Sequence, residues 1–141
     1  MNDRWGRRLF TTGAGVLVLL GLIHSLSLFG KPVPANDTER QLQDLMANYQ
    51  FNLMGSMRTM DSFLRGFSIS FMLAALCLGA LDLAVMRENL ALVKRVALIN
   101  VLWLAAMTAV SLRYFFIFPT ACLASALLIF ALARVKLRAS F

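Results

Sequence analysis

The sequence predicts an all-α integral membrane protein, a four-transmembrane-helix bundle with an extra amphipathic helix between the first and second spans. Hydrophobic residues make up 60% of the 141 residues and charged residues only 15%, and the mean hydropathy is +0.72. A soluble domain usually carries about 25% charged and about 45–50% apolar residues. The apolar residues also gather into four long runs bounded by charged or turn-forming residues. We expect one membrane domain over residues 1–141.

The first predicted span covers about residues 9–30. A short basic segment precedes it, but the apolar run is too long for the h-region of a signal peptide, and Ser25-Leu-Ser-Leu-Phe-Gly30 is a poor cleavage site. About 20 apolar residues are enough to cross about 30 Å of hydrocarbon. We expect the helix to end at Lys31-Pro-Val-Pro34, because two prolines cannot continue it.

The second predicted element is an amphipathic extracytoplasmic helix over about residues 37–53. Thr38 and Gln41 have the spacing of a capping box at its start. Apolar side chains then follow the 3.6-residue period, at Leu42, Leu45, Met46, Tyr49 and Leu53. The helix is too polar to span a membrane, so we expect it to lie on the membrane surface or to cap the bundle. A turn over residues 52–59 follows, with Gly55 as its pivot.

The remaining spans are predicted over about residues 62–85, 96–116 and 119–137. A short basic connection over residues 87–95 separates the second and third spans, and Pro119 suits the first position of the fourth. Small residues four apart would allow close helix packing or oligomerisation. They are Gly21 and Ser25, then Gly66, Ser70 and Ala74, then Ala105 and Ala109.

Lysine and arginine residues predict the orientation. Nine of them flank both termini and the loop between the second and third spans: Arg4, Arg7, Arg8, Arg87, Lys94, Arg95, Arg134, Lys136 and Arg138. Five fall on or near the other side: Lys31, Arg40, Arg58, Arg65 and Arg113. Because basic residues concentrate on the cytoplasmic side, we expect both termini in the cytoplasm. The net charge is +7, but the basic residues cluster beside apolar runs, which argues against binding of nucleic acid.

A layer of polar residues near the outer ends of the spans is the candidate site. Asp61, Arg65 and Ser68 share one face of the second span, and ionisable residues at a membrane helix are costly unless they face protein or water. The predicted ligand-binding residues are His24, Asp61, Arg65, Ser68, Arg113 and Tyr114. Each also has a structural interpretation: hydrogen bonding between helices for His24, an i,i+4 pair for Asp61 and Arg65, snorkelling for Arg113, and an interfacial aromatic belt for Tyr114.

Motifs for catalysis, metals or cofactors are not found in the sequence. The single histidine cannot build a multi-histidine metal site, and GxSxG, P-loop and HExxH patterns are absent. Ser68, His24 and Asp61 lack an elbow or oxyanion hole that would make them a triad. We therefore expect no catalytic residue, no metal and no cofactor. Near the cytoplasmic side, Asp82 and Asn100 lie near the ends of the second and third spans, and we expect Asp82 to pair with Lys94 or Arg95 as a structural contact.

The stretch Ser56-Met-Arg-Thr-Met-Asp61, followed by Gly66-Phe-Ser68 and preceded by His24, carries a resemblance. Over nearly its full length the chain resembles a family of small bacterial four-span membrane proteins to which no activity is assigned. The resemblance implies a bacterial inner (plasma) membrane protein.

These patterns favour a non-enzymatic membrane protein that binds a lipid or other amphiphile, or a partner subunit, through an outward-facing polar pocket. One alternative is a membrane-embedded enzyme acting on a lipid-soluble substrate, with His24 and Asp61 as an acid–base pair. Another is a purely structural accessory subunit. The expected partners are membrane lipid and either a partner membrane protein or a second copy of the chain.

Overall fold

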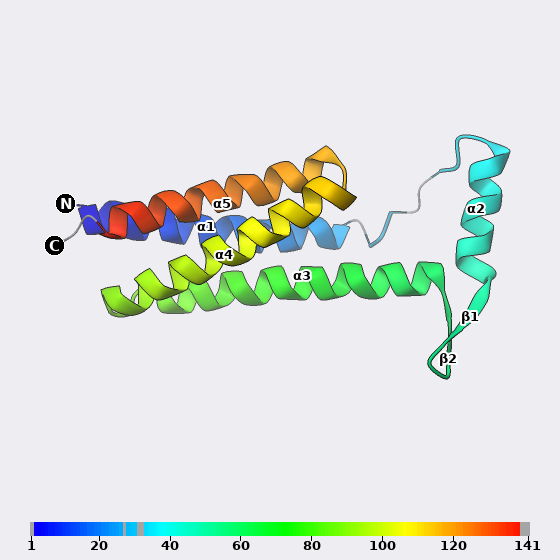
Figure 1. Ribbon diagram of the computed structural model, residues 1–141, viewed down its shortest axis with the longest axis horizontal. Helices are drawn as coiled ribbons and strands as arrows, with labels where there is room; N and C mark the ends of the chain where they lie inside the picture. The colour runs from blue at the N-terminus through cyan, green and yellow to red at the C-terminus, as the bar shows by residue number, and fades with distance from the viewer. Residues whose placement is uncertain (1, 27, 31–32, 139–141) are drawn as a thin grey trace. The chain divides into compact units, whose positions relative to one another are not determined.

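The computed structural model describes residues 2–26, 28–30 and 33–138, and within them the regular elements are helices apart from one short hairpin (Figure 1). The elements are α1 (Asn2–Leu26), α2 (Asp37–Asn48), β1 (Gln50–Leu53), β2 (Ser56–Thr59), α3 (Met60–Val85), α4 (Leu90–Tyr114) and α5 (Ile117–Arg138). Four of these helices, α1, α3, α4 and α5, are long and apolar enough to cross a membrane. The prediction of an α-helical protein with four apolar spans is confirmed, and it indicates a multi-pass membrane protein.

The chain divides into two compact units. Residues 1–20 and 75–141 form one, which we call the four-helix unit, and residues 21–74 form the other, which we call the 21–74 unit. The helices α1 and α3 contribute to both, because each crosses a boundary between them.

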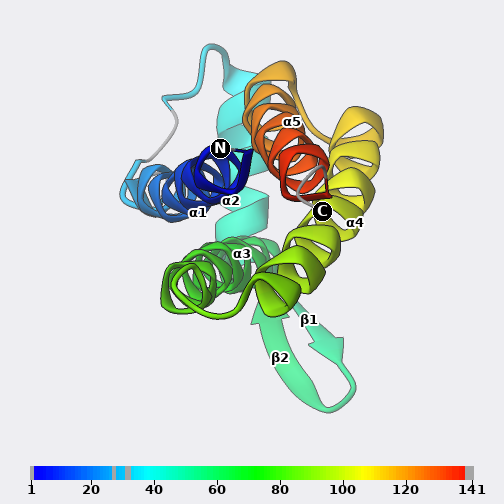
Figure 2. The same cartoon turned by 90° about the vertical axis from the view of Figure 1, so that its left-hand side faces the viewer.

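The core of the four-helix unit is built from one stripe of each helix. On α5 the buried side chains recur every three or four residues: Leu123, Ala126, Phe130, Ala133 and Leu137. The stripe of α4 has the same spacing and consists of Val93, Ala97, Asn100, Leu104 and Ser111. The helices α4 and α5 run antiparallel and lie side by side, as Figures 1 and 2 both show. Repeats of three and four residues place side chains on one helical face, which accounts for these stripes.

Glycines let helices approach closely in this unit. A Cβ added to Gly13 would lie 2.7 Å from the Phe130 ring, and the Phe10 ring also meets that ring edge-on at 5.6 Å between centroids. A Cβ on Gly79 would lie 2.7 Å from Val18 Cγ2 and 3.0 Å from the backbone carbonyl oxygen of Ala14. Glycine is therefore required where α1 meets α5 and α3.

In the 21–74 unit, side-chain caps define the start of α2. The N-cap is Asn36, whose side chain accepts a hydrogen bond from the Glu39 amide at 2.9 Å, while the Glu39 carboxylate accepts from the Ala35 amide at 2.7 Å. These reciprocal bonds satisfy amide donors at the helix start. The capping box predicted at Thr38 and Gln41 was therefore wrong by two residues.

The segment after α2 forms an antiparallel hairpin rather than the end of the predicted helix. The strands pair from Gln50 opposite Thr59 to Leu53 opposite Ser56. Met54 and Gly55, both with positive φ, make the two-residue turn, as a type I′ turn requires. The predicted pivot at Gly55 is confirmed, whereas the helix predicted to about residue 53 ends at Asn48.

Several span limits also differ from the prediction. The helix α1 begins at Asn2 and ends at Leu26, before the Lys31 and Pro32 expected to end it, which lie outside the described residues. The helix α4 begins at Leu90 behind the N-cap Asn89, so most of the connection expected over residues 87–95 is helical. Pro119 is the third residue of α5 rather than the first, a position that still lies in the first turn, where its missing N–H costs no intrahelical bond.

Candidate functional site

The first turn of α3 positions the two charged residues of the predicted site. Thr59 and Ser62 cap the helix reciprocally, since each backbone amide donates to the other's hydroxyl oxygen at 3.2 Å. This cap holds Asp61 in the first turn, where a carboxylate is favoured by the helix dipole. One turn later, Arg65 Nε donates to Asp61 Oδ2 at 3.0 Å. Both side chains are about half exposed, at 50% and 51%, so the predicted pair is present.

Ser68 and His24 belong to the same unit. Ser68 is partly buried, one turn beyond Arg65. His24, in the last turn of α1, is also partly buried, and its ring meets the Phe71 ring edge-on at 5.0 Å between centroids. The carboxylate of Asp61 accepts its hydrogen bond from Arg65.

Arg113 and Tyr114 lie in the four-helix unit, in the last turn of α4, and both are exposed. The Arg113 guanidinium carbon is 5.6 Å from the centroid of the Tyr114 ring, within the range of a cation–π contact. The structure thus brings together Asp61 with Arg65, and Arg113 with Tyr114, as two separate pairs.

A buried polar pair, Asp82 and Asn100, links α3 to α4. The Asn100 amide nitrogen lies 2.8 Å from each carboxylate oxygen of Asp82, and each residue is 1% exposed. Asp82 therefore has Asn100 as its hydrogen-bond partner, where Lys94 or Arg95 was expected. Asn100 occupies the buried stripe of α4, whereas Arg95 is exposed. The spacing of Asn100 from Val93 and Ala97 was the signal that could have identified it.

A second buried pair, Ser111 with Thr120, joins the two helices of the α4–α5 hairpin. Their hydroxyl oxygens are 2.7 Å apart, and Thr120 Oγ1 also donates to the Phe116 carbonyl at 3.1 Å. Both residues are nearly inaccessible, at 2% and 6%. Hydroxyl pairs of this kind link membrane helices, so this contact is structural.

Two of the predicted small-residue rows do not pack within the described part of the chain. Ala74, Ala105 and Ala109 are exposed, and none of the described residues lies within 4 Å of a Cβ added to Gly66. In the first row Gly21 is buried. Gly79, which does permit close packing, had no part in those rows. Gly79 could have been found from its spacing to the buried Ala75 and Asp82.

No group of three His, Cys, Asp or Glu side chains that could hold a metal ion occurs among residues 2–26, 28–30 and 33–138. Comparison of the chain with protein-family models, with curated proteins and with solved structures gives no match.

Proposed function

We propose that the protein is a non-enzymatic membrane protein that binds the anionic headgroup of a lipid or other amphiphile at the start of α3. The geometry of Arg65 carries this proposal. Asp61 accepts a hydrogen bond from Nε, and the two terminal nitrogens of Arg65 donate no hydrogen bond within the described part of the chain. A guanidinium oriented in this way keeps donors that a phosphate or carboxylate accepts.

The surface around Arg65 supports an amphiphilic ligand rather than a free anion. Leu64 is 47% exposed and Phe67 is 61% exposed. Phe63 and Phe67 form an edge-to-face pair with centroids 4.8 Å apart. A charged donor flanked by accessible apolar side chains matches a ligand with an anionic head and an acyl chain.

The proposal includes two further predicted residues of the 21–74 unit, His24 and Ser68. His24 donates to or accepts from the headgroup, and Ser68 supplies a hydroxyl. Arg113 and Tyr114 belong to the four-helix unit, where the guanidinium lies against the tyrosine ring, and they are not assigned to this site.

The setting we propose is a bacterial inner membrane, with both termini in the cytoplasm and residues 31–61 outside. The distribution of lysine and arginine supports this orientation. We further propose that α2 is an amphipathic helix on the outer membrane surface. Its apolar side chains Leu42 and Leu45 are 55% and 62% exposed, and Tyr49 at its C-cap is 66% exposed, so they are accessible to the interface.

Native mass spectrometry of the gently extracted protein, with lipid identification, tests the Arg65 site. We expect the wild type to retain a discrete amphiphile and Arg65→Ala to lower its occupancy about tenfold, as the loss of charge-assisted hydrogen bonds predicts. Arg58→Ala is the matched control, because Arg58 is an exposed arginine of the adjacent strand that donates only to its neighbour Met57. Its occupancy should equal that of the wild type.

Two outcomes would reject the Arg65 site. Equal retention by wild type and Arg65→Ala would show that the guanidinium does not hold the ligand. A wild-type protein that carries a stoichiometric second chain and no amphiphile would instead indicate an accessory subunit. Circular dichroism of each variant checks that its helices remain folded.

A further inference from the structure

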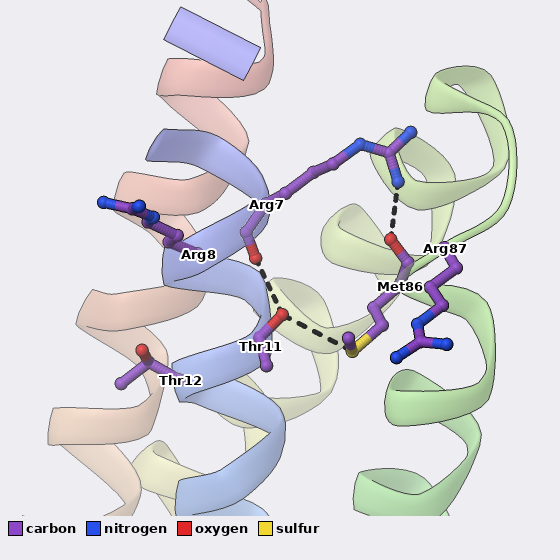
Figure 3. A pocket seen from close by; sticks show the side chains of 6 residues that line it. All are labelled: Arg7, Arg8, Thr11, Thr12, Met86 and Arg87. Atoms are coloured by element: carbon purple, nitrogen blue, oxygen red, sulfur yellow. Dashed lines mark hydrogen bonds between the residues drawn. The ribbon is translucent and has the colours of Figure 1, made fainter. Parts of the chain in front are cut away.

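A basic hollow lies at the other end of α3, within the four-helix unit. It has a volume of about 660 Å³ and is lined by Arg7, Arg8, Thr11, Thr12, Met86 and Arg87. Figure 3 shows Arg7 reaching from α1 to the Met86 carbonyl, with Arg8 and Thr12 on one side of this bridge and Arg87 on the other. None of these residues belongs to the site proposed above.

Arg7 builds the frame of this hollow. One of its terminal nitrogens donates to the carbonyl oxygen of Met86 at 2.5 Å and the other to that of Glu88 at 2.8 Å. These carbonyls follow the C-terminal end of α3, where unpaired acceptors and the helix dipole favour a cation. Thr11 donates to the Arg7 carbonyl at 2.9 Å and contacts the Met86 sulfur at 3.6 Å. The polypeptide thus fixes the distance between α1 and the turn after α3.

The other two arginines of the hollow, Arg8 and Arg87, form no ion pair with the described residues. Arg8 has the Trp5 ring as its contact, at 5.9 Å from the guanidinium carbon to the centroid. Within residues 2–26, 28–30 and 33–138, neither Arg8 nor Arg87 forms an ion pair, and the nearby acids Asp3 and Glu88 form none either. Arg8 and Arg87 lie on either side of the Arg7 bridge (Figure 3), so the hollow gathers three positive charges that attract an anion.

The surroundings favour an anion that belongs to a membrane. Trp5 is 58% exposed one turn before Arg8, and exposed tryptophan is typical of the headgroup level of a bilayer. The apolar run of α1 begins directly after Arg8, at Leu9. Basic pockets between membrane helices bind anionic lipid headgroups in this way.

We propose that the hollow binds the phosphodiester headgroup of an anionic phospholipid from the leaflet on the side of the two termini. Arg87 contacts the phosphate on one side of the Arg7 bridge, Arg8 and Thr12 attract the headgroup from the other side, and Arg7 holds the site open while adding positive charge. The acyl chains extend along the apolar surface of α1 beyond Leu9.

The test uses full-length protein carrying Trp103→Phe, which leaves Trp5 as the single tryptophan of the chain. Dioctanoyl phosphatidylglycerol is titrated into protein in a neutral detergent while Trp5 fluorescence is followed. We expect saturable binding that weakens about tenfold or more in Arg8→Gln/Arg87→Gln, because each arginine near a membrane surface contributes to attraction of anionic lipid. Arg4→Gln/Lys136→Gln removes the same charge from two exposed residues outside the hollow and should leave affinity within about twofold.

Further titrations distinguish a lipid headgroup from free phosphate as the bound anion, and distinguish the hollow from the Arg65 site. Dioctanoyl phosphatidylcholine and inorganic phosphate should each bind at least about tenfold more weakly than phosphatidylglycerol. Arg65→Ala should leave the Trp5 titration unchanged, so the two proposals fail independently. Equal weakening in the two double variants, unchanged binding in Arg8→Gln/Arg87→Gln, or tight binding of inorganic phosphate would each overturn the proposal. Both substituted arginines are exposed, and Arg8→Lys/Arg87→Lys, which keeps the charge, should recover part of the affinity.

Discussion

At the scale of single residues, the contact between Asp82 and Asn100 places a carboxyl group in the buried interior of the four-helix unit. Removing a carboxyl from water is expensive unless donors replace the lost solvent. Asn100 is the donor that does so, with one amide nitrogen 2.8 Å from both oxygens. The pair therefore makes the packing of α3 against α4 specific, since a shift along either helix would leave the carboxyl buried and unbonded.

Asn100→Leu should destabilise the protein, because it removes the donor and leaves Asp82 buried. The expected decrease in the free energy of unfolding is about 1–3 kcal/mol. Unfolding by sodium dodecyl sulfate in mixed micelles, followed by circular dichroism, measures it. The double variant Asp82→Leu/Asn100→Leu should recover most of the loss, since replacing both partners by apolar groups is nearly neutral. An Asn100→Leu variant as stable as the wild type would show that the pair contributes nothing.

One member of this pair could be predicted from the sequence. Asp82 was recognisable as a buried candidate because an acid inside an apolar run needs a partner. Its partner was missed because the third span was predicted from Val96, which placed Lys94 and Arg95 in a loop. With α4 starting at Leu90, the spacing from Val93 through Ala97 puts Asn100 on the buried face. The predicted start of α4 therefore decided which residue was assigned as the partner of Asp82.

At the scale of elements, two glycines of α3 have opposite surroundings. Gly79 faces α1, where an added Cβ would meet Val18 Cγ2 at 2.7 Å and the Ala14 carbonyl oxygen at 3.0 Å. Gly66 faces nothing within 4 Å. A backbone oxygen cannot rotate away as a side chain can, so the contact of α1 with α3 depends on Gly79.

Gly79→Ala should therefore separate α1 from α3 and lower the free energy of unfolding by about 1–3 kcal/mol, the usual cost of overpacking. Gly66→Ala, on the same helix, should be neutral or stabilising because alanine favours helix by up to about 1 kcal/mol over glycine. The same detergent unfolding experiment compares the two variants. Equal stabilities would mean that α1 and α3 accommodate the methyl group and that close approach is not required.

The hairpin between α2 and α3 marks what helical periodicity could not predict. Tyr49 and Leu53 continue the 3.6-residue period of α2 and so favoured helix to about residue 53. The chain instead turns at Met54 and Gly55, and the Gly55 amide donates to the Asn52 side chain at 2.8 Å. The Met-Gly pair is a weaker hairpin signal than Asn-Gly. The 3.6-residue period of the apolar residues therefore outweighed it in the prediction.

At the scale of the whole molecule, the four spans were predictable because a long apolar run can be recognised without knowing how the helices pack. The polar layer was not predictable in the same way. A shared level for His24, Asp61 and Arg113 depends on the offsets between three helices, whereas periodicity fixes only the face of each helix. The pairs within one helix, Asp61 with Arg65 and Arg113 beside Tyr114, follow from local spacing alone, and the structure contains both.

Orientation is the property of the whole molecule on which both proposed sites depend, since each assigns its lipid to one leaflet. Single cysteines at exposed positions test it, on a background in which Cys77 and Cys122 are replaced by alanine. We expect a membrane-impermeant maleimide to label Ser56→Cys, in the hairpin, in intact cells, and to label Glu88→Cys, in the turn after α3, only after lysis. This result follows from the excess of basic residues around the turn and the termini.

The reverse labelling pattern would invert the topology and move the Arg65 site to the cytoplasmic leaflet. Labelling of both cysteines from one side would mean that α3 does not cross the membrane, although its length and hydropathy allow it to.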